Sequence, residues 1–183
     1  MRLRIKMKRL NHFFKYFTFI GILLLCNACT GFRFTFSGVN LDPNVKTFSV
    51  ETFDNRAPDG PSNMGIVFSD GFRDYMARNT PLTLVPQGEQ GDLQFEGTVT
   101  GYRITPISPG ASELENADFQ RLTITVKVNF VNNYDDQANF DQNFSFYFDF
   151  EASQNITSVE AEALDVIFEQ IYFDVFNASV ATW

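Results

Sequence analysis

The sequence predicts an α+β fold, a two-layer sandwich with two helices packed on one face of a mostly antiparallel four-stranded sheet. Three observations lead to this prediction. Four long segments alternate apolar with polar residues, or are rich in β-branched and aromatic residues, as strands are. Two further segments carry apolar residues at helical spacing. Their order, namely strand, helix, several strands and helix, lets both helices bury their apolar stripes against one sheet.

The residue pattern over 45–85 predicts a strand, a helix and a second strand. Residues 45–53 form a strand candidate, and a turn-rich loop with two prolines follows over 54–61. Apolar residues recur at helical spacing over 64–79, and Pro81 ends this helix because proline cannot continue it. A short strand over 82–85 comes next.

Residues 93–104 predict a long strand with one irregularity. Apolar residues from Leu93 to Val99 share one face, whereas Tyr102 falls on the opposite parity. A β-bulge near Gly101 accounts for the change, since glycine inside a strand commonly marks a bulge. A loop over 106–118 follows.

The remaining segments predict a hairpin and a final helix. Apolar and polar residues alternate strictly over 122–130, a turn spans 132–139, and phenylalanines line one face of 140–150. Together these segments make an antiparallel hairpin with one buried face. Thr157–Glu160 has the T-x-x-E pattern of a capping box, and the helix that it opens runs to about Ala178.

The first 28 residues resemble a bacterial lipoprotein signal. They carry six basic residues and no acidic one, with an apolar stretch over 16–26 that is shorter than the ~20 residues of a membrane-spanning helix. Small Ala28 precedes Cys29, which suits cutting before the cysteine and attaching lipid to its thiol. We expect 1–28 to be a signal peptide and Cys29 to be lipidated. A plain secretion signal, cut near Ala28, is the alternative.

Lipidation predicts where the protein works. Each buried methylene of a palmitate-type chain contributes about 0.8 kcal/mol, and two or more chains anchor a protein stably. Thr30 follows the cysteine, rather than the aspartate that retains proteobacterial lipoproteins at the inner membrane, and no acidic cluster follows it. We expect a lipidated tether over 29–44, a single α+β domain over 45–183, and a lipid anchor in the cell outer membrane facing the periplasm.

Composition excludes several classes of function. Removal of the leader leaves 155 of the 183 residues, with eight basic and 22 acidic side chains and a net charge of −14. Nucleic acid is excluded as a partner because phosphate backbones require a basic surface. His12 and Cys26 both lie in the leader, so the mature domain has no histidine and no free thiol. We therefore predict no Ser-His-Asp or Cys-His enzyme, no metal site and no cofactor.

Several segments resemble LptE, the outer-membrane lipopolysaccharide-assembly lipoprotein family, in its Bacteroidota form. They occur in order along nearly all of the mature chain. They are Val45–Val50, Phe53–Pro58, Gly91–Gly97, Gly101–Tyr102, Arg121–Val126, Ser153–Glu160 and Phe176–Trp183. The resemblance implies two helices on a mostly antiparallel sheet. It also implies a lipoprotein that sits as a plug inside the large LptD β-barrel, which delivers lipopolysaccharide to the outer leaflet.

Four residues are candidates for contact with the partner or with lipopolysaccharide: Arg56, Tyr102, Arg103 and Arg121. Arginine forms bidentate hydrogen bonds with phosphate, and the last two arginines flank the predicted loop between the long strands. Tyr102, like Tyr147, has the parity opposite to that of core-facing neighbours, and tyrosine is enriched in interfaces. The alternative is a solvated acidic surface with ordinary ion pairs.

We predict an outer-membrane lipoprotein, not an enzyme, that plugs and helps assemble the LptD-type β-barrel translocon inserting lipopolysaccharide into the outer leaflet. One alternative is an envelope lipoprotein that itself binds lipopolysaccharide or another lipid. Another is an accessory subunit of a different outer-membrane complex. A hydrolase that uses acidic residues would require paired carboxyl groups in a pocket, and no compact carboxylate motif is present.

Overall fold

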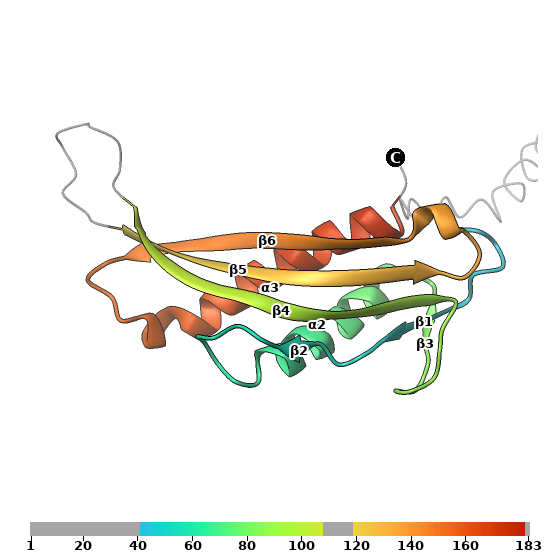
Figure 1. Ribbon diagram of the computed structural model, residues 1–183, viewed down its shortest axis with the longest axis horizontal. Helices are drawn as coiled ribbons and strands as arrows, with labels where there is room; N and C mark the ends of the chain where they lie inside the picture. Colours follow the sequence, from blue (N-terminus) through green and yellow to red (C-terminus); the bar gives the residue numbers. More distant parts are fainter. Residues whose placement is uncertain (1–40, 108–118, 182–183) are drawn as a thin grey trace, which may run out of the picture. The chain divides into compact units, whose positions relative to one another are not determined.

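The computed structural model describes residues 41–107 and 119–181, and the leader, Cys29 and most of the predicted tether lie outside them. The described residues form an α+β fold, with two helices and a six-stranded sheet in the order β3-β1-β4-β5-β6, in which β2 also pairs with β4 (Figure 1). The elements are β1 (Thr47–Val50), β2 (Asp54–Asn55), α2 (Met64–Asn79), β3 (Thr83–Leu84), β4 (Leu93–Ile107), β5 (Phe119–Asn132), the 3-10 turn η2 (Asp136–Ala138), β6 (Phe140–Glu151) and α3 (Ile156–Ser179).

The sheet is mixed, so the prediction of a mostly antiparallel sheet of four strands was wrong in detail. β1 runs parallel to both β3 and β4, and β2 runs parallel to β4. Only β4, β5 and β6 form an antiparallel set. Helix α2 follows β2 and carries the chain back, so that β3 enters the sheet in the direction of β1, as helical crossovers do. The apolar pattern of a strand carries no information about this direction.

Of the strand predicted over 45–53, only Thr47–Val50 forms a strand, β1. β2 (Asp54–Asn55) lies in the loop predicted over 54–61, and a break over 51–53 separates the two strands. At the break, the Phe53 N–H donates a hydrogen bond to the buried Ser69 Oγ of α2 (2.8 Å). The Ser69 hydroxyl in turn donates to the Gly65 carbonyl oxygen (2.7 Å). A Cβ at Gly65 would collide with the Phe53 carbonyl group. The helix therefore approaches the break closely and satisfies the backbone group that the ladder leaves unpaired.

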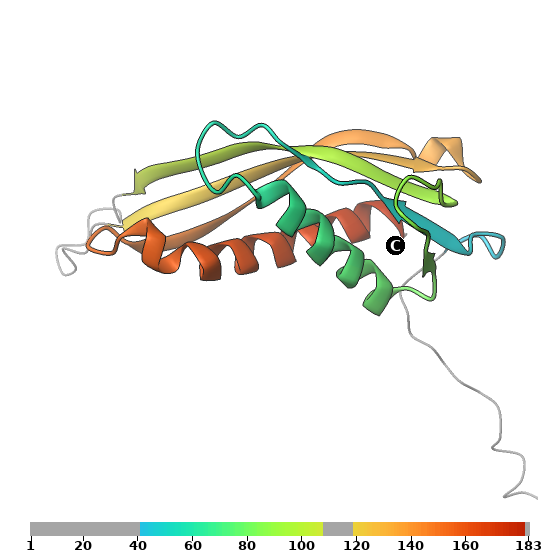
Figure 2. The same cartoon turned by 90° about the horizontal axis from the view of Figure 1, so that it is seen from below.

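Both helices lie on one face of the sheet, as predicted (Figure 2). An aromatic contact joins the helices to the sheet, since the rings of Phe72 in α2 and Phe95 in β4 are 5.1 Å apart. Another joins the two helices, since the rings of Phe68 and Tyr172 are 5.0 Å apart. Phe144 and Phe150 of β6 are buried in the same core. No helix among the described residues combines the length and the apolar character needed to span a membrane.

The bulge in β4 is confirmed, because the register with β5 shifts between Val99 and Gly101. The extra residue returns Tyr102 to the core side of the sheet, where it is 7% exposed. β4 and β5 are also longer than predicted, and they reach Ile107 and begin at Phe119. The predicted loop over 106–118 is otherwise outside the described residues.

The bounds of α2 agree with those predicted, whereas the capping box predicted for α3 was wrong. Asn155 caps α3, and its side-chain oxygen accepts a hydrogen bond from the Thr157 N–H (3.0 Å). Because the helix starts earlier than Thr157, Glu160 lies beyond the position from which it could close a capping box. Its carboxylate instead accepts a hydrogen bond from the Tyr102 hydroxyl (2.6 Å).

Candidate interaction surface

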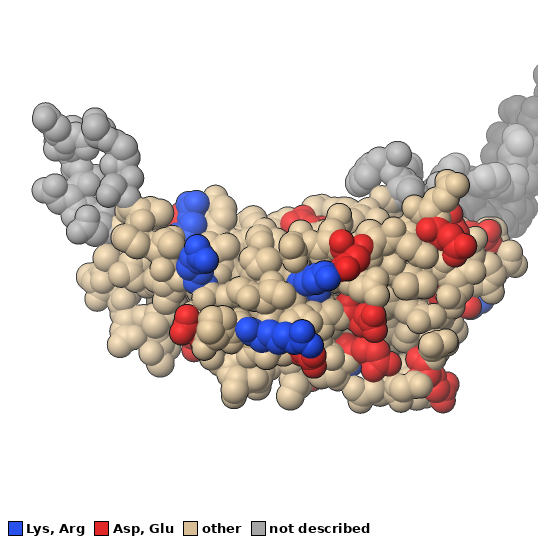
Figure 3. All heavy atoms as spheres, in the orientation of Figure 1, with Lys and Arg blue, Asp and Glu red and all other residues tan. Residues whose placement is uncertain are grey.

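The sheet face that no described helix covers is polar from β4 to β6 (Figure 3). Period-two alternation turns the apolar side chains of these strands toward the helices and the polar ones outward. We call this the outer face. On β5 its main residues are Arg121, Thr123, Thr125, Lys127 and Asn129, and each has outward neighbours in register on β4 and β6.

Arg121 is held rigidly on the outer face by two neighbours on β6. Its guanidinium forms two hydrogen bonds with the Asp149 carboxylate, both 2.7 Å long. It also lies 3.6 Å from the centre of the Tyr147 ring, which stands 44% exposed. The hydrogen bonds with Asp149 raise the pKa of Arg121. The result is a fixed cation stacked on an exposed aromatic ring.

The structure places two further predicted arginines on the outer face. Arg103 is exposed and lies opposite Thr123 on β5. Arg121 lies two residues before Thr123 on β5, opposite Thr105, so Arg103 and Arg121 are diagonal neighbours on the outer face. Neighbours related in this diagonal way lie about 7–8 Å apart at their Cα atoms. Arg56 follows β2 and contacts the Asp54 carboxylate at 3.2 Å, with both side chains largely exposed. β4 separates it from Arg121, so the three arginines share a face but do not converge on one point.

Tyr102 does not belong to this surface, and its prediction as a contact residue is corrected by its placement. Its ring lies in the core beneath Gly60, and its hydroxyl donates to Glu160. Burial, and then the hydrogen bond to Glu160, raise the pKa of Tyr102. The sequence shows that Tyr102 has the opposite parity to Leu93 and Val99, but it does not show that the bulge turns Tyr102 back toward the core. Asp149 was missed as a site residue, and only its register opposite Arg121 identifies it.

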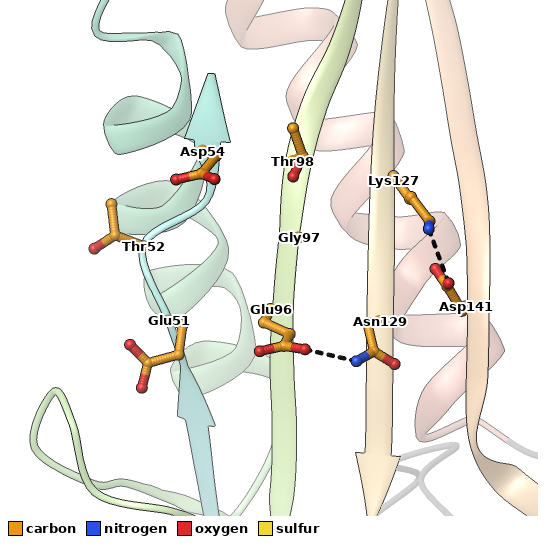
Figure 4. A pocket seen from close by; sticks show the side chains of 9 residues that line it. All are labelled: Glu51, Thr52, Asp54, Glu96, Gly97, Thr98, Lys127, Asn129 and Asp141. Atoms are coloured by element: carbon orange, nitrogen blue, oxygen red, sulfur yellow. Dashed lines mark hydrogen bonds and ion pairs between the residues drawn. The ribbon is translucent and has the colours of Figure 1, made fainter. Parts of the chain in front are cut away.

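A hollow of about 400 Å³ lies on the outer face over β4 and β5, between β2 and β6 (Figure 4). Its lining residues are Glu51, Thr52, Asp54, Glu96, Gly97, Thr98, Lys127, Asn129 and Asp141. The Lys127 ammonium lies 2.8 Å from Asp141, and Asn129 donates to Glu96 (2.7 Å). Four carboxylates and one lysine make the hollow acidic. No group of three or more His, Cys, Asp or Glu within 41–107 and 119–181 is arranged to hold a metal ion.

Comparison with known proteins identifies one family. The model of the LptE family, described as lipopolysaccharide-assembly, matches residues 45–179. No curated protein matches the chain.

Solved structures of low sequence identity resemble the chain. A minor lipoprotein from Acinetobacter baumannii shares 10% identity over 72% of this chain and 89% of its own, with a TM-score of 0.45. Lipoprotein GNA1162 from Neisseria meningitidis shares 12% identity over 72% and 99%, with a TM-score of 0.40. Rare lipoprotein B from Shewanella oneidensis shares 7% identity over 70% and 89%, with a TM-score of 0.39.

Proposed function

The chain belongs to the LptE family of lipopolysaccharide-assembly lipoproteins, which are not enzymes, and we propose that it plugs and helps assemble an LptD-type β-barrel in the outer membrane. The barrel inserts lipopolysaccharide into the outer leaflet. The observation that carries the proposal is the family match, which extends from β1 to the end of α3. The mechanism is structural: the domain occupies the barrel lumen while a lipid holds it at the membrane.

The outer face supports this proposal. Interiors of large outer-membrane barrels are polar, so a plug needs polar side chains on the surface that meets the wall. Arg56, Arg103 and Arg121 are the contacts that we propose on this face. The remaining acidic surface of the mature chain calls for basic patches on the opposing wall, since complementary charges set the orientation of docking.

Anchoring completes the proposal and concerns residues outside the described part of the chain. Residues 1–28 act as the signal peptide, and Cys29 carries the lipid. Residues 29–44 form the tether to the domain over 45–183. This arrangement places the domain on the periplasmic side of the outer membrane.

A pull-down of the full lipidated protein from detergent-solubilised outer membrane tests the proposal. After a high-salt wash, we expect mass spectrometry to find one large β-barrel of the LptD type in stoichiometric amount. Recovery of the protein alone, or with an unrelated complex, would contradict the plug.

A charge-reversal pair then tests the proposed face. Arg103→Glu should lower the recovery of the barrel several-fold. Arg78→Glu is the matched control, since Arg78 is an exposed arginine of α2 whose only described ion pair, with Glu169, is 3.8 Å long. Equal recovery with both variants would reject the outer face as the contact and leave the barrel partnership standing.

Direct binding of lipopolysaccharide is a second candidate function, favoured by the neighbouring positions of Arg103 and Arg121. Guanidinium groups bind phosphates in a bidentate way. Asp149 already occupies the Arg121 guanidinium, so Arg103 is the freer donor. A measured affinity that falls with salt and with Arg103→Ala would support this function. An affinity unchanged by either would exclude these arginines as the site.

A further inference from the structure

Among the described residues, β6 forms an edge of the sheet and pairs only with β5 (Figure 1). Its pairing with β5 runs in unbroken register from Phe119 opposite Glu151 to Phe130 opposite Phe140. Within the described residues, no group outside β5 forms a hydrogen bond with the backbone of residues 140–150. Alternate N–H and C=O groups along this strand therefore point away from the sheet and have no partner within 41–107 and 119–181.

The sequence of β6 carries three acidic residues but lacks several other features that block an exposed edge. It contains no proline, no lysine or arginine, and no bulge in its pairing with β5. Such an edge is a template for pairing with another strand. Phe140, Phe146 and Phe148 on its core side are only partly buried, so an added strand would find apolar surface to cover.

We propose that β6 binds an extended segment of a partner protein as an additional strand, one whose residues alternate between apolar and basic. Apolar residues would extend the core side beside the partly buried phenylalanines. Basic residues would face outward, where β6 carries Asp141, Asp149 and Glu151 and no basic residue. Lys127 and Arg121 of β5 pair with the first two, so Glu151 leaves this side with a net negative charge. Backbone hydrogen bonds supply affinity in this mode of recognition, and alternate side chains supply specificity.

Charge also argues against a second copy of the chain as the occupant. An antiparallel pair of β6 strands centred on Ser145 would place Asp141 of one copy opposite Asp149 of the other. Like charges directly opposite each other in a sheet are destabilising. The inference is independent of the proposed barrel partnership, since it rests only on β6 and its neighbours.

Peptide binding to the full lipidated protein in detergent micelles tests the inference. The probe is a fluorescent peptide that alternates valine and lysine, and its controls are a valine–glutamate peptide and a fully N-methylated copy that has no backbone N–H to donate. We expect the lysine peptide to bind and to slow hydrogen exchange in residues 140–150. N-methylation or replacement of lysine by glutamate should weaken binding at least tenfold.

Two variants locate the effect. Ser145→Lys puts a positive charge on the outward side of β6 and should weaken binding of the lysine peptide several-fold. Thr100→Lys adds the same charge to an exposed residue of β4, away from the edge, and should leave binding unchanged. Equal binding of the N-methylated peptide, absence of binding by the lysine peptide beyond that to empty micelles, or protection away from β6 would each overturn the inference.

Discussion

At the residue scale, the hydrogen bond from Tyr102 to Glu160 joins β4 to the first turns of α3. It is 2.6 Å long, and the tyrosine ring is buried. Hydrogen bonds to charged groups contribute about 1.5–3 kcal/mol, so Tyr102→Phe should lower the free energy of unfolding by about 1–2 kcal/mol in urea denaturation. Tyr147→Phe is the control, because that ring is exposed and its hydroxyl has no described hydrogen bond. Equal losses in both variants would contradict the role of the bond.

Asp92 makes a comparable connection at the start of β1. Its carboxylate accepts hydrogen bonds from the Lys46 N–H (2.8 Å), the Thr47 N–H (2.9 Å) and the Thr47 hydroxyl (2.9 Å). Chiefly through the Lys46 bond, these contacts lower the pKa of Asp92. A lowered folded-state pKa stabilises the fold above the ordinary aspartate pKa of about 3.9, and this stability is lost as the pH falls through the folded value.

Asp92→Asn should therefore make stability less dependent on pH in the acid range. Urea midpoints measured from pH 6 down to pH 3 should fall less steeply in this variant than in the wild-type protein. Asp136→Asn is the control and should follow the wild-type curve, because Asp136 is exposed in the turn between β5 and β6. Parallel curves for wild type and Asp92→Asn would show that Asp92 does not contribute.

At the scale of elements, Gly97 explains how β4 accommodates the break between β1 and β2. The Phe53 ring lies where a Gly97 side chain would be, 2.6 Å from an ideal Cβ, and the Lys127 carbonyl oxygen crowds the same space. Overpacking costs about 1–3 kcal/mol, so Gly97→Ala should lower the urea midpoint markedly. Gly101→Ala is the matched control in the same strand, because its nearest neighbour, the Thr125 Cβ, is 3.2 Å away. A smaller loss for Gly97→Ala than for Gly101→Ala would contradict this packing.

The same elements show what a sequence can and cannot predict. The bounds of α2 followed from local signals, because Pro81 and helical spacing act within a few residues. The β4 bulge followed from a parity change near Gly101. The early end of the first strand at Val50 did not, because the break after it is stabilised by a hydrogen bond between Phe53 and Ser69, which lie 16 residues apart. The cap of α3 was misassigned because Thr157 offered a second local pattern two residues beyond Asn155.

At the scale of the whole molecule, the partition into a covered and an uncovered sheet face followed from alternation alone. The site on the uncovered face did not, because it depends on register. Arg121 was predicted as a contact residue, but its ion pair with Asp149 was not, because the two residues lie 28 positions apart on neighbouring strands. The parallel strands depend on the direction in which α2 returns the chain. The sequence therefore predicted features that depend on nearby residues and missed those that depend on the pairing of distant strands.

Whole-molecule charge makes a final prediction about anchoring. Residues 29–183 carry a net charge of −14, which disfavours attraction to anionic lipid headgroups. Membrane attachment should then depend entirely on acyl chains at Cys29. We expect the lipidated protein, and its Cys26→Ser variant, to float with vesicles of phosphatidylethanolamine and phosphatidylglycerol. Cys29→Ser should stay unbound at low and high salt, because it lacks the acyl chains and their ~0.8 kcal/mol per methylene. Flotation of Cys29→Ser would place the membrane contact on the folded domain instead.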